Sequence, residues 1–235
     1  MTSLFGTNSD DNLLGSDFED SIFGLDGNDI IRGGGGNDSL FGGPGDDNLT
    51  GNNANSVTGF PGNDYLFAGK GNDRLDGLGG ADVLFGDIGN DTVFGGDGAD
   101  EVFGNQAEDT LDGGNDNDTL YGGQGGDSLA GSIGDDWLFG DGGNDTLFGG
   151  NGNDRFVFRP GDGTDTIINY SAGDSIVLNA NDGISAADLQ FVDGTGINQG
   201  SLLMNLTSTG ETLAILQTTS VEEFNSIGLI EVLDI

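Results

Sequence analysis

Aspartate recurs at every ninth residue over most of this chain, and glycines precede it at fixed steps. Residues 33–41, 95–103 and 149–157 show the unit plainly, in the order Gly-Gly-x-Gly-x-Asp-x-apolar-x. We number its positions 1 to 9, so that aspartate stands at position 6. Carboxylate and carbonyl oxygens are the ligands of hard cations such as Ca²⁺, which takes about six to eight of them. The spacing therefore predicts a row of similar oxygen sites.

The expected carboxylate ligands are the position-6 aspartates of successive units. They are Asp11, Asp20, Asp29, Asp38, Asp47, Asp64, Asp73, Asp82, Asp91, Asp100, Asp109, Asp118, Asp127, Asp136, Asp145, Asp154, Asp165 and Asp174. Glycine adopts positive φ at little cost, so glycines at positions 2 and 4 allow the loop to curl and turn its carbonyls inward. The expected carbonyl ligands are those of Gly34, Gly36, Gly43, Gly45, Gly69, Gly71, Gly80, Gly89, Gly96, Gly98, Gly123, Gly125, Gly143, Gly150 and Gly152. The row predicts on the order of ten Ca²⁺ ions between stacked loops.

Aspartate at this step could instead cap turns without binding a metal. That interpretation leaves many carboxylates stacked at strand spacing, where like charges repel strongly. Mg²⁺ is a weaker candidate than Ca²⁺, because it demands tight octahedral geometry and keeps its waters.

Some units depart from the pattern. Residues 51–58 are interpreted as an eight-residue unit with Asn55 in place of aspartate, so sites that use this loop should be weak or absent. Ser9, Phe18, Ala107 and Asp116 replace glycine at position 4, and we expect their loops to be strained or reshaped.

Position 8 is apolar in every regular unit and predicts a buried core. Position 8 would point inward in a short strand, with positions 7 and 9 outward. A strand of three residues cannot bury its apolar side chain alone, so the units must stack, two to a turn of 18 residues. The expected fold is all-β, a right-handed parallel β-roll (a β-solenoid) over residues 1–177. Stacking would place Asp73 beside Asp91 and Asp82 beside Asp100, each pair sharing an ion.

Glycine becomes scarce after residue 177, and apolar alternation appears. Residues 201–206, 212–216 and 227–233 are expected to be strands. We interpret residues 178–235 as a C-terminal β cap outside the repeat, since a solenoid needs its open end covered.

The composition excludes several classes of function. The chain carries 41 acidic and 5 basic residues, for a net charge of −36, which argues against nucleic acid or an anionic membrane as partner. No apolar stretch approaches the length of a transmembrane segment, and no signal peptide is visible at the N-terminus. The chain has no His and no Cys, and no Gly-x-Ser-x-Gly motif. We expect it not to be an enzyme.

The nonapeptide resembles the calcium-binding repeat of the RTX, or haemolysin-type, family, which forms parallel β-helices. The resemblance covers about residues 6–177. It implies secretion by a type I exporter that reads an uncleaved C-terminal signal, and residues 231–235 are compatible with such a signal. It therefore implies a secreted, extracellular protein.

Aromatic side chains are expected on the outer face of one sheet only. The face combines position 9 of alternate units with two residues at position 7. Its members are Tyr65, Phe67, Phe85, Phe103, Tyr121, Trp137 and Phe139. Stacked side chains of one kind support a solenoid. The alternative is a partner face, used for self-association or for a cell surface, or covered by the cap.

These features predict a secreted calcium-binding structural protein that folds on binding Ca²⁺. Without the ion, net charge and glycine entropy oppose compaction, and binding energy would become folding energy. The alternatives are an adhesin or surface-layer component that uses the aromatic face, or the C-terminal secretion module of a larger toxin or enzyme.

Overall fold

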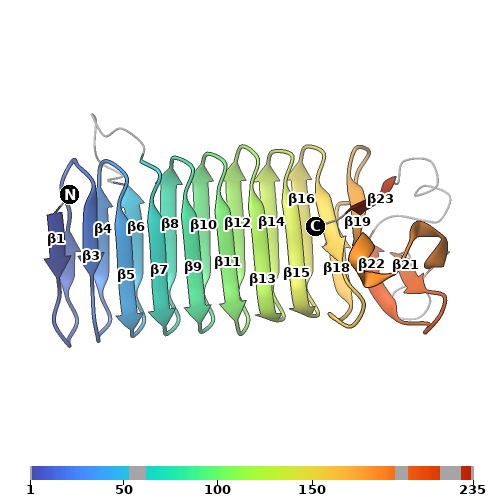
Figure 1. Cartoon of the computed structure of the whole chain (residues 1–235), viewed down its shortest axis with the longest axis horizontal. Helices are drawn as coiled ribbons and strands as arrows, with labels where there is room; N and C mark the ends of the chain where they lie inside the picture. The colour runs from blue at the N-terminus through green and yellow to red at the C-terminus, as the bar shows by residue number, and fades with distance from the viewer. Residues whose placement is uncertain (1, 53–61, 194–200, 218–228, 234–235) are drawn as a thin grey trace.

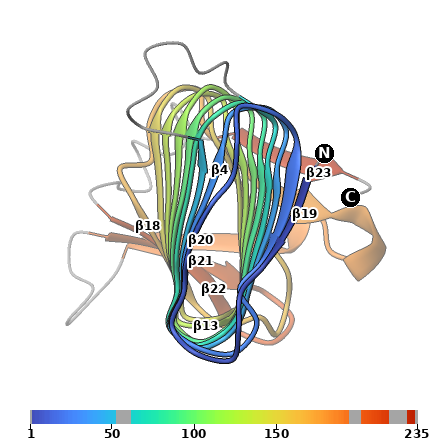
Figure 2. The same cartoon turned by 90° about the vertical axis from the view of Figure 1, so that its left-hand side faces the viewer.

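The computed structural model describes residues 2–52, 62–193, 201–217 and 229–233 of the 235-residue chain. Successive strands alternate between two sheets, so strands of one sheet are paired in parallel along the length of the roll (Figure 1). Seen along the roll, the two sheets face each other and turns join them at both edges (Figure 2). The expected all-β solenoid of stacked parallel coils is confirmed.

The first sheet, sheet A, has eleven strands. They are β1 (Thr2–Phe5), β3 (Asp20–Phe23), β5 (Ser39–Pro44), β7 (Tyr65–Lys70), β9 (Val83–Ile88), β11 (Glu101–Gln106), β13 (Thr119–Gly125), β15 (Trp137–Gly143), β17 (Arg155–Phe158), β19 (Ser175–Asn179) and β23 (Leu229–Leu233). Sheet B has twelve strands. They are β2 (Asn12–Leu14), β4 (Ile30–Gly34), β6 (Asn48–Asn52), β8 (Arg74–Gly79), β10 (Thr92–Asp97), β12 (Thr110–Asn115), β14 (Ser128–Ile133), β16 (Thr146–Asn151), β18 (Asp165–Ile168), β22 (Thr212–Gln217), β21 (Ser201–Leu206) and β20 (Leu189–Asp193).

The strands of the central coils are longer than the sequence predicted. β11 spans six residues, from position 7 of one unit to position 3 of the next, where three had been expected. The glycines at positions 1 and 2 predicted a loop, because glycine disfavours strands. In the roll, neighbouring coils pair at positions 7–9 and again at positions 2 and 3, so the ladder overrides that preference. Only positions 4–6 remain as the turn.

The core lies between the two sheets and follows position 8, as predicted. Most of its members are 0–1 % exposed. They are Ile22, Ile31, Leu40, Leu49, Leu66, Leu75, Leu84, Val93, Val102, Leu111, Leu120, Leu129, Leu138, Leu147 and Phe156. Their burial along a single row makes each coil dependent on its neighbours for a core.

Residues 51–58 were predicted to be a unit of their own, and this is corrected by the strand register. β5 pairs directly with β7, and Ser39 stands opposite Tyr65, 26 residues later rather than 18. The extra eight residues therefore enlarge one loop of one coil, with Gly51 at its position 1 and Asp64 at its position 6. Asn55 lies outside the described residues. Both sheets continue across the enlarged loop without a break, because β6 likewise pairs with β8.

The C-terminal residues continue both sheets. β22 pairs in parallel with β18 and then antiparallel with β21, while β23 pairs in parallel with β19. The three strands expected beyond residue 200 are present at Ser201–Leu206, Thr212–Gln217 and Leu229–Leu233. Two short 3₁₀ helices, Ala180–Asp182 and Ala186–Asp188, connect the roll to this region. Among the described residues, no helix is both long and apolar enough to cross a membrane.

Candidate metal centre

The position-6 aspartates line the two edges of the roll, at the points where each turn enters a strand. Seventeen of the eighteen are 0–4 % exposed, and Asp11 is half-buried. Positions 6, 8 and 1 alternate along an extended backbone, so all three face the interior. The aspartates are therefore enclosed within the roll and not displayed on its surface.

From Asp29 to Asp174, one carboxylate oxygen of each position-6 aspartate accepts a hydrogen bond from the preceding coil. The Asp73 N–H donates to Oδ1 of Asp91, and the Asp82 N–H donates to Oδ1 of Asp100, both at 2.8 Å. The same bond recurs from coil to coil on both edges, and it spans 26 residues between Asp38 and Asp64. The pairs expected at a spacing of 18 residues are thus side by side.

The second carboxylate oxygen has no partner in fourteen of these aspartates. Their Oδ2 atoms are buried and accept no hydrogen bond. The fourteen are Asp29, Asp38, Asp47, Asp64, Asp73, Asp82, Asp91, Asp100, Asp109, Asp118, Asp127, Asp136, Asp145 and Asp154. Leaving a buried charged oxygen without a partner costs several kcal/mol, on the order of the desolvation penalty of an ion. A partner for Oδ2 is therefore expected at each of these positions.

Glycine at position 1 makes room for this oxygen. A Cβ built on Gly104 would lie 2.5 Å from Oδ2 of Asp109 and 2.6 Å from the carbonyl oxygen of Gly122. The same two kinds of oxygen crowd the equivalent point at Gly122, at 2.6 Å from Asp127 and 2.7 Å from Gly140. A carboxylate oxygen and a carbonyl oxygen of the next coil therefore converge on one space. The repeat pattern predicted no role for position 1, although period-two alternation places this position inside the roll.

Burial raises the pKa of these carboxyl groups, and neighbouring aspartates add to the rise in most of them. The pKa is raised from 3.8 to about 6 at Asp47, about 7 at Asp38 and about 8 at Asp118. The hydrogen bond from the preceding coil opposes the rise without cancelling it. The interior thus disfavours an ionised carboxylate without a counter-ion. Binding of a proton or a cation would remove this cost.

The terminal loops differ from the central ones. Oδ2 of Asp11 accepts the Thr7 N–H at 2.6 Å and its hydroxyl at 2.9 Å. Oδ2 of Asp20 likewise accepts from Ser16, at 2.7 and 2.8 Å. At the other end, Oδ2 of Asp174 accepts the Ser171 N–H at 2.6 Å. These loops close on their own carboxylates.

The fifteen glycines expected to turn carbonyls inward all have positive φ, which supports the proposed curl of the loop. At position 4, Ala107 and Asp116 are held in the same conformation, at φ 84° and 76°, and so carry the expected strain. Ser9 and Phe18 are absent from the positive-φ residues, and theirs are the two N-terminal loops that close on themselves. Reshaping and strain therefore occur at different departures from the pattern.

Position 5 adds a second ladder of hydrogen bonds that was not predicted from the sequence. The Asn28 N–H donates to Oδ1 of Asp10, Asp46 to Asn28, and Asn72 to Asp46, at 2.8–3.1 Å. These bonds join side chains on the exposed rim of the turns to the next backbone. The recurrent Asn or Asp before the position-6 aspartate was the available signal.

A cation in the interior would rely largely on backbone oxygens. Nowhere in the described part of the chain do three acidic side chains gather closely enough to hold an ion by themselves. Ca²⁺ accepts such mixed sets of carboxylate and carbonyl ligands. The unpartnered Oδ2 atoms, the converging carbonyls and the lack of His and Cys together fit a hard cation.

The predicted aromatic face lies on the outside of sheet A, and it begins earlier than predicted, with Phe5, Phe23 and Phe41 in the same row. Most neighbouring rings stack face to face, as Phe85 does on Phe103 at 4.6 Å between centroids and Phe103 on Tyr121 at 4.8 Å. Phe139, 8 % exposed, packs with Val157 and Val177 toward the cap.

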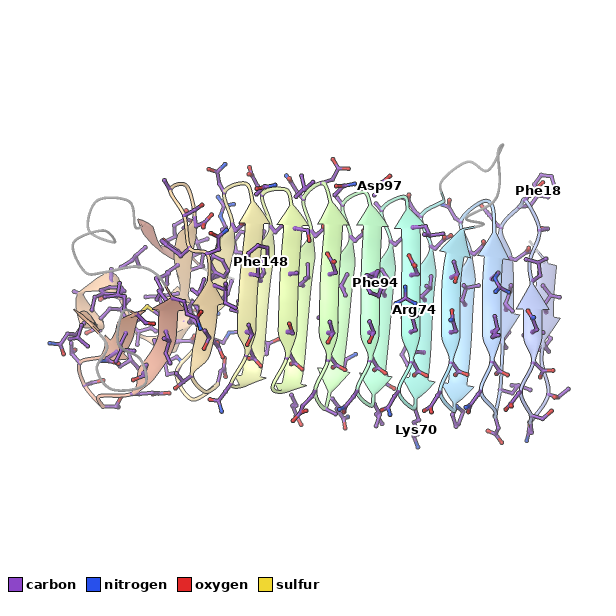
Figure 3. All side chains as sticks on the ribbon, turned by 180° about the vertical axis from the view of Figure 1, so that it is seen from behind. Phe18, Lys70, Arg74, Phe94, Asp97 and Phe148 are labelled. Atoms are coloured by element: carbon purple, nitrogen blue, oxygen red, sulfur yellow. The ribbon has the colours of Figure 1, made fainter. Side chains whose placement is uncertain are left out.

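Sheet B presents a more polar outer face, seen in Figure 3. Arg74, Phe94 and Phe148 lie on it, and the Arg74 guanidinium sits 4.3 Å from the centre of the Phe94 ring. No continuous ring stack forms on this side among the described residues, because polar residues such as Asp76 and Asp112 occupy the row.

A model of the RTX calcium-binding nonapeptide repeat (4 copies) matches residues 5–40, 23–57, 58–93, 94–129, 121–156 and 130–167. The chain belongs to this family. RTX repeats form calcium-binding rolls, which agrees with the row of enclosed aspartates. No curated protein matches the chain. Among solved structures, the extracellular lipase LipA from Serratia marcescens is similar at 17 % identity and a TM-score of 0.33, over 97 % of this chain. The chain spans 40 % of that lipase.

Proposed function

We propose that this chain is a calcium-binding structural protein whose folding is coupled to Ca²⁺. The observation that carries the proposal is the row of fourteen buried carboxylate oxygens without a partner. RTX membership gives the ion its identity, and the carbonyl oxygens that lie beside most of these carboxylates would give it further ligands. The proposed role is structural and not enzymatic: the bound ions stabilise the fold.

The expected ligands are the position-6 aspartates, with carbonyls of the Gly-rich loops. On this view Asp29 to Asp154 form the working row, and on the order of ten ions would fill it. Asp11, Asp20 and Asp174 are weaker candidates, because their second oxygen is already hydrogen-bonded within its own loop. Asp165 stands next to the cap and accepts the Asp145 N–H at 3.0 Å.

When bound, the ion supplies positive charge where the protein has none. The described interior contains no basic side chain, and the five basic residues of the chain cannot balance 41 acidic ones. Each coil adds further aspartates to the interior, so the cost of folding without cations accumulates along the roll. Binding energy would therefore appear as folding energy.

The same coupling suits a secreted protein. A cytosol low in calcium would keep the chain extended for a type I exporter, and the extracellular concentration would fold it. RTX membership supports secretion and the exporter. A secretion assay with residues 178–235 removed tests both, and loss of secretion is the expected result.

Circular dichroism with and without calcium tests the folding proposal. The chain in chelator at neutral pH should give a coil spectrum, and Ca²⁺ should restore the β signal, whereas Mg²⁺ at the same concentration should restore much less. Equilibrium dialysis should then count on the order of ten ions per chain. A full β spectrum in chelator at neutral pH would refute the coupling.

A further inference from the structure

The ring stack on the outer face of sheet A is interrupted between β5 and β7. Phe23 and Phe41 are stacked at 4.7 Å between centroids and 4° between planes, and Phe85 and Phe103 at 4.6 Å and 5°. Phe41 and Phe67 stand opposite each other in the strand register. Among the described rings, however, Phe67 forms a close pair only with Phe85, and that pair is tilted by 46°. Two parallel stacks are therefore separated by a gap between Phe41 and Phe67.

Tyr65 accounts for the interruption. It stands at position 7 of the same unit as Phe67, where the preceding coil of sheet A has Ser39. Its ring lies 6.2 Å from that of Phe41 and 5.3 Å from that of Phe85, and both pairs are tilted by 47°. Tyr65 thus takes the place beside Phe41 that Phe67 has in a continuous stack. One ring face on each side of the gap is left without a parallel partner.

A pocket of about 380 Å³ opens at this gap. Phe23, Phe41 and Phe67 line it, together with Leu25 in the turn after β3 and Pro44 at the end of β5. Its volume lies in the range of about 300–1,000 Å³ that is typical of small-molecule sites. β3, β5 and β7 each have a paired strand on both sides, so the pocket belongs to the continuous sheet and not to an end of the roll.

Elsewhere on the roll, guanidinium groups lie over aromatic rings. The Arg74 guanidinium is 4.3 Å from the centre of the Phe94 ring on the neighbouring strand of sheet B (Figure 3). The Arg155 guanidinium is 5.2 Å from the centre of the Trp137 ring on sheet A. Two of the five basic residues of the chain are thus placed over rings. The surface of the roll therefore already pairs aromatic rings with organic cations.

The gap beside Tyr65 lacks such an internal cation. Two units of the repeat have an aromatic residue at both positions 7 and 9, and their position-7 residues are Tyr65 and Trp137. On the next strand, Arg155 stands opposite Trp137, whereas Val83 stands opposite Tyr65. No basic residue of the described chain lines the pocket. A cation at this gap must therefore come from another molecule.

The charge around the pocket favours a cation. Asp26 is exposed and lines the pocket, and the chain as a whole carries −36. Lys70 stands opposite Pro44 in the register, but its side chain projects from the edge of the roll (Figure 3) and does not line the pocket. A cation is therefore attracted to the Asp26 end of the pocket, and an anion is repelled.

We propose that this pocket binds a small soluble molecule through a methylated ammonium group. The methyl groups pack against Phe41, Phe67 and Leu25, while the charge interacts with the two ring faces and with Asp26. Among the described residues, only Asp26 and Asn8 bring polar side chains to the pocket, so a primary ammonium finds few acceptors for its three N–H groups. Asp26 stands at position 3 and is not an expected calcium ligand, so this site is separate from the calcium row.

Isothermal titration calorimetry of the full chain in calcium tests the proposal, with choline and tetramethylammonium as probes. Both should bind with a Kd on the order of 1 mM, as expected for partly exposed ring faces and one carboxylate. The matched control ligand is 3,3-dimethylbutan-1-ol, which has the shape of choline with carbon in place of the charged nitrogen. It should bind about ten times more weakly than choline.

Two pairs of variants locate the site. Phe67→Leu should weaken choline binding about 5- to 30-fold, whereas Phe103→Leu, within the continuous stack, should leave it unchanged. Asp26→Asn should weaken it about two- to fivefold. Asp97→Asn is the matched control, because Asp97 is an exposed position-3 carboxylate beyond sheet B and should have no effect.

Circular dichroism of each variant in calcium separates failure to fold from failure to bind, and the calcium coupling is judged without choline. Absence of saturable choline binding to the folded wild type overturns the proposal. Equal affinity for the neutral alcohol does so too, since the site would then recognise shape and not charge. Unchanged choline affinity in folded Phe67→Leu places the ligand elsewhere and is equally contrary. Asp26 is exposed, so Asp26→Asn keeps the test decisive where the ring variant does not fold.

Discussion

The central and N-terminal loops of this roll share the nine-residue repeat, but they differ in whether the second carboxylate oxygen of their aspartate accepts a hydrogen bond. In the central loops, Oδ2 of Asp109 faces a carbonyl oxygen across a space kept open by Gly104. In the first loop, Oδ2 of Asp11 accepts two hydrogen bonds from Thr7. Thr7 stands at position 2, where central units hold a residue with positive φ. The conformation at position 2 therefore distinguishes an aspartate whose Oδ2 is hydrogen-bonded by its own loop from one whose Oδ2 has no hydrogen-bond partner.

The largest expected difference concerns pH in the absence of calcium. The folded pKa values of central aspartates lie above 3.8, so their contribution to stability is fully present below that pH and is lost as pH rises through about 6 to 8. A proton on Oδ2 can donate to the carbonyl that it faces. In chelator, the β signal in circular dichroism should therefore be retained at pH 5 and disappear by pH 8.5. A metal-free chain that gains β structure as pH rises would contradict this prediction.

Calcium should reverse this dependence of stability on pH. At neutral and higher pH the ion satisfies the carboxylates, and acid displaces it by protonating its ligands, so the stabilisation due to calcium falls as pH falls. Thermal unfolding in calcium and in chelator, compared at several pH values, measures the difference. Equal slopes in the two conditions would show that the central carboxylates do not bind the ion.

Removing one carboxylate should separate the two kinds of loop. Asp109→Asn should lower the free energy of unfolding in calcium by about 3 kcal/mol, since losing a site filled at a hundred times its Kd costs about 2.7 kcal/mol. Asp11→Asn loses hydrogen bonds at a half-buried position and should cost about 1 kcal/mol. Denaturant unfolding in calcium compares the two. An equal loss of unfolding free energy in both variants would contradict the proposed difference between the two kinds of loop.

A single methyl group at position 1 should act in the same direction. Gly104→Ala places a Cβ against Oδ2 of Asp109 and should cost about 1–3 kcal/mol through overpacking, together with weaker calcium binding. Gly126→Ala is the matched control, because a Cβ there meets nothing closer than 3.5 Å. Calcium titrations of both variants measure the effect. Ala68 stands at position 1 in place of glycine and invites the reverse change, and Ala68→Gly should strengthen calcium binding.

The smallest effect is expected from the ring stack. Phe103 is stacked on both sides, whereas Phe5 has one neighbour and is 65 % exposed. Phe103→Leu should cost about 1–2 kcal/mol and Phe5→Leu less than half of that, since a ring pair contributes about 0.5–1.5 kcal/mol. Thermal unfolding in calcium resolves the two. A change in oligomeric mass on Phe103→Leu without loss of stability would instead support a partner face.

The sequence predicted what depends on strict periodicity. The period places Leu111 and Leu129 in the core and Asp73 beside Asp91, because stacked coils leave no other arrangement. It did not reveal strand length, since Gly113 and Gly114 disfavour strands in isolation and are extended only through the ladder. The role of position 1 was missed for the same reason, as glycine inside a core leaves no apolar signal.

Departures from the period were harder to interpret. Residues 51–58 resemble a short unit, and only the pairing of β5 with β7 shows that they enlarge one loop. The closure of the first two loops depends on φ at Thr7 and Ser16, and nothing in their residue types distinguishes an N–H turned toward the carboxylate from one turned away.

The enlarged coil shows how such a chain can gain new parts. Asp38 reaches Asp64 across 26 residues by the same hydrogen bond that elsewhere spans 18. The loop between positions 2 and 4 thus accommodates eight additional residues while both of its ends return to the same neighbours. A binding loop or a domain with adjacent termini could be grafted there for the entropy of loop closure alone, about 0.6 kcal/mol for each doubling of length. The number of coils on each side of the loop would then determine where the grafted part lies along the roll.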